Sequence, residues 1–178
     1  MSYDFSKNHF ELFGLDAAFK IDLERLDQGY RELQSQVHPD KFAHASSAER
    51  RLSMQWATLA NEAYQTLKRP IDRARYLLHL RGVETGEDTN TAMPPAFLIE
   101  QMELRESLQQ AKAAQDMGLL QRLEQGLKQE SRRLQEELER RLDVEGDLAG
   151  AALGVRKLRF LEKLGAEIDE AYETLEPS

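Results

Sequence analysis

The sequence predicts an all-α protein. Its 178 residues include 27 leucines and 19 alanines but only four valines and four isoleucines. Leucine and alanine favour helices, whereas β-branched residues favour strands. Apolar residues also recur every three or four positions along most of the chain, which is the period of an amphipathic helix.

Four helices are expected in the first half of the chain, at residues 9–13, 22–38, 46–68 and 71–80. Gly14 ends the first of them, and Asp22 is a typical N-cap residue for the second. Pro39 ends the second helix, because the residue before a proline avoids the α conformation. The second and third helices therefore predict an antiparallel hairpin, with a short helix on either side.

Three longer helices are expected in the second half, at residues 95–117, 119–144 and 153–175. Gly118 is expected to end the first of them, and three glycines mark the connection before the last, at Gly146, Gly150 and Gly154. Each helix carries an apolar stripe that can face a core. A three-helix bundle is the simplest way to bury three such stripes.

The boundary between the two halves is marked by composition and by charge. Residues 84–95 are mostly polar and include glycine and two prolines, which is typical of a linker. Residues 1–83 hold 12 basic and 11 acidic side chains, whereas residues 84–178 hold 12 basic and 21 acidic ones. We therefore expect two domains, 1–83 and 96–178, with different binding partners.

Composition excludes several classes of function. The chain has no cysteine and a net charge of −8, which argues against thiolate metal sites, disulfides and nucleic-acid binding. No apolar stretch is long enough for a membrane span, and no signal peptide is visible, so we expect a cytoplasmic protein without a membrane partner. The four histidines are not paired at metal-ligand spacing, and we expect neither a metal nor a cofactor.

The tripeptide His38-Pro39-Asp40 lies in the loop expected between the two hairpin helices. A Pro-Asp pair alone is typical of an ordinary turn. Its surroundings, however, resemble the J-domain family of co-chaperones, which stimulate the ATPase of DnaK-type chaperones. The matching parts are the tripeptide itself, residues 30–37, Lys41-Phe42, residues 59–67, Pro70 and Arg73-Ala74.

The resemblance implies that this loop docks on the chaperone partner, through His38, Pro39, Asp40, Arg31 and Lys41. Proline fixes the loop, histidine offers a hydrogen-bond donor and acceptor, and aspartate offers a charge. One departure from the family is the helix before the loop, in which two arginines are outnumbered by acidic residues. That departure favours a specialised DnaK-type partner.

Over nearly the whole chain, the sequence resembles the HscB (Jac-type) co-chaperones of iron–sulfur cluster assembly. The matching segments are residues 9–15, 75–78, 97–106 and 155–164. Eukaryotic members add a cysteine-rich segment, so this chain is similar to the bacterial form. The resemblance implies two partners, the DnaK-type chaperone HscA and the cluster scaffold IscU, and it implies that any ATP hydrolysis occurs on the chaperone. We expect no enzyme activity in this chain.

The helix at 95–117 carries two apolar faces. At about 100° per residue, Phe97 groups with a core stripe, whereas Leu98, Ile99 and Met102 fall well away from it. Pattern alone leaves two interpretations open, a second core contact or an exposed binding surface. The family resemblance favours scaffold binding, by Leu98, Ile99, Met102, Glu103, Glu106 and Phe160. The next acidic family position is Gln110 here, which is expected to weaken that contact.

Two alternatives remain open. The chain could be a J-domain co-chaperone with a different or general client, which would bind unfolded peptides broadly. It could also be a coiled-coil protein that self-associates through residues 119–144, although Glu130 and Glu137 interrupt a strict heptad pattern. We expect a monomer.

Overall fold

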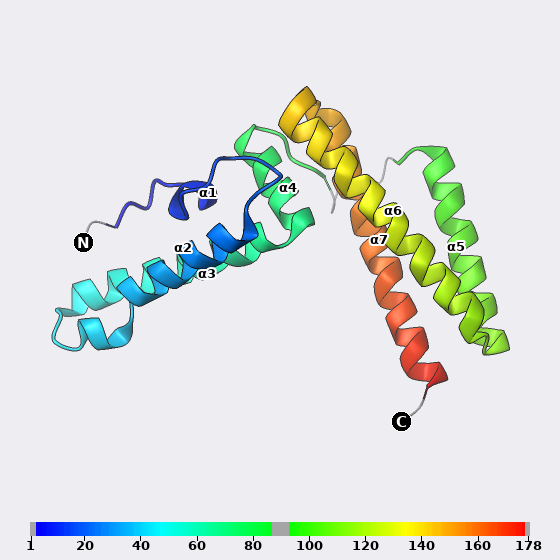
Figure 1. The fold of residues 1–178 in the computed structure, drawn as a ribbon, viewed down its shortest axis with the longest axis horizontal. Coiled ribbons are helices and arrows are strands. Elements are labelled where there is room, and N and C mark those ends of the chain that lie inside the picture. Colours follow the sequence, from blue (N-terminus) through cyan, green and yellow to red (C-terminus); the bar gives the residue numbers. More distant parts are fainter. Residues whose placement is uncertain (1–2, 87–92, 177–178) are drawn as a thin grey trace. The chain divides into compact units, whose positions relative to one another are not determined.

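The computed structural model describes residues 3–86 and 93–176, and all of the regular secondary structure in those residues is helical (Figure 1). This confirms the predicted fold class. The chain divides into two compact units, Met1–Leu80 and Arg81–Ser178. The linker expected at 84–95 lies partly outside the described residues, because these omit 87–92. None of the described helices is long and apolar enough to cross a membrane.

The first unit is an antiparallel helical hairpin with short flanking helices, as expected. Its elements are α1 (His9–Leu12), α2 (Leu23–Gln36), η1 (Pro39–Phe42), α3 (Ser47–Lys68) and α4 (Pro70–Leu80). Asp22 caps α2 by accepting hydrogen bonds from the amides of Glu24 and Arg25. Ser46 and Glu49 form a capping box at the start of α3. These caps place both ends of the loop between α2 and α3.

Tyrosines hold α2 and α3 together on the outer side of their apolar core. The rings of Tyr30 and Tyr64 stack at 4.1 Å between centroids. The Tyr30 hydroxyl donates to Asn61 Oδ1 at 3.1 Å, and the Tyr64 hydroxyl donates to Asp27 Oδ1 at 2.6 Å. Two hydrogen bonds and a stacked pair thus fix the register of the hairpin that presents the loop.

The second unit is the expected three-helix bundle. Its helices are α5 (Pro95–Ala114), α6 (Met117–Arg140) and α7 (Leu148–Leu175), with a π-helical turn, η2 (Arg141–Glu145), after α6. All three helices contribute to one buried cluster, which consists of Leu108, Ala111, Leu120, Leu164, Ile168 and Ala171. The bundle therefore buries the apolar stripes from which it was predicted.

The connection between α5 and α6 differs from the expectation. Helix α5 ends at Ala114, and Gln115 turns the chain with a left-handed φ of 53°. Asp116 then caps α6 by accepting a hydrogen bond from the Leu119 amide at 3.0 Å. Gly118 is thus part of α6 and was wrongly predicted to end the preceding helix, because an aspartate cap two residues earlier already begins the next one.

Helix α7 begins at Leu148, before the expected start at residue 153. Asp147 caps it by accepting a hydrogen bond from the Gly150 amide. Gly154 lies inside the helix, and a Cβ there would come within 3.2 Å of the Leu138 side chain of α6. Gly150 and Gly154, which were predicted to lie in the connection before this helix, therefore belong to the helix itself. Gly154 permits the close approach of α6 and α7.

Two arginines attach the beginning of the second unit to the bundle. Arg81 donates to the carbonyl of Leu142, within η2, at 2.8 Å. Arg156 of α7 donates to the carbonyl of Thr85 at 3.0 Å. These two hydrogen bonds hold Arg81 and Thr85 against the bundle.

The environment of Tyr172 in the bundle leads us to predict how the stability of the protein responds to alkaline pH. A hydrogen bond to Glu124 of α6 raises the pKa of Tyr172 from 10.0 to about 12. A raised pKa in the folded state stabilises the fold below the unfolded pKa, and that contribution is lost as the pH rises towards 12. The unfolding temperature of the wild type should therefore exceed that of Tyr172→Phe at pH 8, and the difference should shrink between pH 10 and pH 12. A difference that stays constant over this range would contradict the assignment.

Candidate functional site

The loop between α2 and α3 is organised around His38. The ring nitrogen Nδ1 accepts a hydrogen bond from the amide of Asp40 at 3.2 Å, so His38 caps the 3₁₀ turn η1, in which Pro39 is the first residue. Asp40 Oδ2 also lies 3.6 Å from Nδ1. Because Nδ1 accepts the amide hydrogen, it carries no proton in this geometry, and we assign the contact as a close approach without an ion pair. Nε2 is then the ring's donor, and both side chains are exposed.

The predicted chaperone-binding residues are exposed in the first unit. Four of them, His38, Pro39, Asp40 and Lys41, lie together at the start of η1. Arg31 lies on the exposed side of α2, within its last two turns. The structure therefore places a cation on the helix that leads into the loop, and a histidine, a carboxylate and an ammonium group within the loop.

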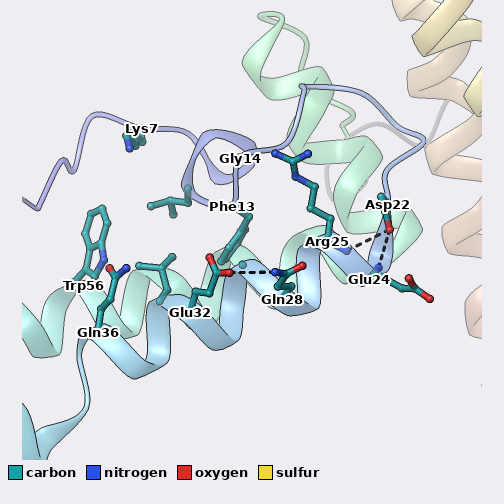
Figure 2. Close-up of a pocket in the computed structure, with 13 residues that line it drawn as sticks. Lys7, Phe13, Gly14, Asp22, Glu24, Arg25, Gln28, Glu32, Gln36 and Trp56 are labelled. Carbon is teal, nitrogen blue, oxygen red and sulfur yellow. Dashed lines mark hydrogen bonds between the residues drawn. The ribbon is translucent and has the colours of Figure 1, made fainter.

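A groove of about 670 Å³ runs along α2 in the same unit, between that helix and the segment that contains α1 (Figure 2). Its lining includes Lys7 and Arg25 together with Glu24 and Glu32. No serine, threonine, cysteine or histidine is among its described lining residues, so it offers no nucleophile–base pair. Within residues 3–86 and 93–176, no group of histidine, aspartate and glutamate side chains is placed to hold a metal ion.

A second exposed surface lies on α5. Leu98 is 38% exposed, Ile99 56% and Met102 63%. Phe97 of the same helix is buried, as are Leu108 and Ala111. Ile99 and Met102 thus lie on the side of α5 that faces away from the bundle core, and Leu98 lies at the edge of that side. Of the two interpretations left open by the sequence pattern, this favours the exposed surface.

Two predicted carboxylates share that side of the helix. Glu103 and Glu106 are both exposed, and at about 100° per residue they lie on the same face as Ile99 and Met102. The resulting surface, which we call the α5 face, has an apolar centre and an acidic edge. It consists of Leu98, Ile99, Met102, Glu103 and Glu106.

Phe160 joins this surface from α7. Its ring is half-buried and lies edge-on to the ring of Phe97, at 6.0 Å between centroids. Arg105 of α5 also pairs with Glu167 of α7 at 3.5 Å. Leu98 lies seven residues before Arg105, as Phe160 does before Glu167, and α5 and α7 run in the same direction (Figure 1). Seven residues make about two helical turns, so Leu98 and Phe160 lie on the same sides of their helices as Arg105 and Glu167. Leu98 and Phe160 therefore lie on facing sides of α5 and α7.

One residue under the α5 face was missed by sequence reasoning. Gln101 is only 6% exposed, and among the described residues no group donates a hydrogen bond to its Oε1. Its place could have been found from spacing, because it follows the buried Phe97 by four residues and precedes Leu108 by seven. It was overlooked because a glutamine is usually exposed.

Comparison with known proteins identifies relatives that match along almost the whole chain. A co-chaperone protein HscB homolog of Aromatoleum aromaticum is 49% identical over 176 residues, which cover 99% of each chain. A co-chaperone protein HscB homolog of Burkholderia thailandensis is 53% identical over 169 residues, which cover 95% of this chain and 96% of the relative.

A solved structure and a family model give the same result. The chaperone HscB from Vibrio cholerae matches with a TM-score of 0.84 and 38% identity, over 96% of this chain and all of that one. The family model described as the HSCB C-terminal oligomerisation domain matches residues 93–169. This range contains α5, α6 and most of α7, and with them the whole α5 face and Phe160.

Proposed function

The chain belongs to the HscB co-chaperone family, and from that premise we propose that it links the iron–sulfur scaffold IscU to the DnaK-type chaperone HscA. The α5 face and Phe160 bind the scaffold. The loop of His38, Pro39 and Asp40, with Arg31 and Lys41, docks on the chaperone and stimulates its ATPase. Family members are named as co-chaperones, and the chain is accordingly a co-chaperone and not an enzyme.

The observation that supports this proposal is the separation of two exposed surfaces onto two units. The chaperone-binding residues lie within Met1–Leu80, whereas the α5 face lies within Arg81–Ser178. An adaptor needs two such surfaces, since both partners must be held at once. We propose the domain limits 1–83 and 96–178 with a linker at 84–95, and the cytoplasm as the place of action.

The chemistry of the α5 face indicates what its partner must offer. Three neighbouring apolar side chains form the centre and carboxylates form the edge, which is the usual anatomy of a specific protein interface. The complementary surface has an apolar centre bordered by lysine or arginine. A general client-binding protein would instead bind unfolded peptides of many sequences, and a competition titration with such peptides separates the two functions.

We expect salt to weaken scaffold binding more than chaperone docking. Attraction between exposed charges is screened at physiological ionic strength, and the second unit carries most of the negative charge. Titration calorimetry with purified scaffold, at increasing sodium chloride concentrations, measures the effect. Replacing Glu103 and Glu106 by glutamine should flatten the salt dependence.

A matched control lies on α7. Glu170 and Glu173 are exposed and have the same spacing as the carboxylates of the α5 face. Their replacement by glutamine removes the same charge and should leave the salt dependence steep. Equal flattening by both pairs would show that only net charge matters.

Sedimentation velocity on the same samples counts the chains. We expect one per complex, whereas two or more would favour the assembly named in the family description.

A further inference from the structure

The two halves of helix α5 bury different kinds of side chain. Its four buried residues are Phe97 and Gln101 in the first half and Leu108 and Ala111 in the second. Leu108 and Ala111 belong to the buried cluster to which α6 and α7 contribute. In the first half, one of the two buried side chains is therefore polar.

The buried amide of Gln101 weakens the packing of that first half. A carbonyl oxygen removed from water without a hydrogen bond costs free energy in the packed state, and it regains water when the helix separates from its neighbours. No described group donates to Gln101 Oε1, and the side chain is more than nine-tenths buried. The packed and separated states of this segment thus differ less in free energy than they would with an apolar residue at this position.

The N-terminus of α5 lacks the stabilisation that the other two helices of the bundle receive. Asp116 and Asp147 cap α6 and α7 with side-chain hydrogen bonds. Pro94 at the start of α5 provides no such bond. A helix without a side-chain cap at its N-terminus frays more readily. This observation is independent of the buried amide and concerns the same half of the helix.

We propose that Gln101 is a positioning residue for the α5 face, because its buried and unpaired carbonyl lets the first half of α5 separate from the bundle at low cost. Leu98, Ile99 and Met102 all lie in this half and are exposed, whereas Gln101 between them is buried. When the segment moves, the apolar centre of the face moves with it and adjusts to the surface of a protein partner. This consequence for binding rests on the proposed function, whereas the motion itself does not.

Hydrogen exchange on the full chain, without any partner, tests the motion. The protection factor of an amide is the ratio of its exchange rate in an unstructured chain to its rate in the protein. In the wild type, the protection factors of residues 99–104 should be about tenfold lower than those of Leu134 and Leu138 in α6 or Leu161 and Leu164 in α7. In Gln101→Met, a substitution of similar shape without polar atoms, protection of 99–104 should rise about tenfold while α6 and α7 change little. Gln101→Leu should behave in the same way.

Gln110→Met provides the matched control, because Gln110 is an exposed glutamine on the same helix. It should leave the exchange of 99–104 unchanged. Wild-type protection at 99–104 equal to that of α6 and α7 would overturn the proposal, as would a Gln101→Met variant that loses protection throughout the bundle. If the motion is found but scaffold affinity is the same in wild type and Gln101→Met, the motion stands and its role in binding is wrong.

Discussion

Replacing His38 by glutamine is expected to abolish stimulation of the chaperone ATPase and to leave scaffold binding unchanged. The imidazole is exposed, and its Nδ1 accepts the Asp40 amide hydrogen, which leaves Nε2 as the donor toward a partner. Glutamine removes this ring but keeps Pro39, so the turn can still form. Stimulation should fall at least tenfold, towards the basal rate of the chaperone, in a single-turnover ATPase assay.

A second histidine provides the control for this substitution. His44 is also exposed and lies just after η1, within the same connection between α2 and α3. His44→Gln makes the same chemical change six residues away and should keep full stimulation. The mechanism is wrong if His38→Gln stimulates as well as the wild type. If both variants lose stimulation equally, the loop as a whole matters and His38 has no special role.

The fold was predictable where local signals determine it. Asp22 caps α2 and Pro70 begins α4, and both are short-range effects that depend only on neighbouring backbone groups. The apolar stripe of α7 likewise identified residues that are buried in the structure, among them Leu158, Leu161 and Leu164. A period of 3.6 residues is therefore enough to define the helices and their inner sides.

Some errors arose where local caps were missed, at Asp116 before α6 and at Asp147 before α7, and others arose where tertiary contacts decide the structure. At Gly154, inside α7, a Cβ would come within 3.2 Å of the Leu138 side chain of α6, a neighbour that is distant in sequence. The π-helical turn η2 was not predicted either, and the Leu142 carbonyl within it accepts a hydrogen bond from Arg81. Such contacts are decided by the packed bundle and leave no periodic signal in the chain.

The candidate site was predictable to different degrees. Helical spacing alone placed Leu98 and Met102 away from the core, and their exposure confirms that placement. Spacing could not choose between a second core contact and an exposed surface, because both look the same in a single helix. The placement of Phe160 beside α5 required the relative register of α5 and α7, which the Phe97–Phe160 ring contact and the Arg105–Glu167 ion pair supply.

Replacing both Leu98 and Met102 by alanine is expected to weaken scaffold binding by at least about thirtyfold, with no loss of bundle stability. Each side chain buried in an interface contributes on the order of 1–3 kcal/mol, and about 1.4 kcal/mol corresponds to a tenfold change in affinity. Because both are exposed in the free protein, their truncation should cost the fold little.

The matched control is Leu52→Ala with Met54→Ala on α3, in the other unit. Leu52 is 41% exposed and Met54 71%, which is close to the 38% of Leu98 and the 63% of Met102. Calorimetry should show unchanged scaffold affinity for the control pair. If the α5 pair also binds with wild-type affinity, the α5 face is not the scaffold site, even if the His38 experiment succeeds. The two substitutions therefore test the two surfaces of the adaptor separately.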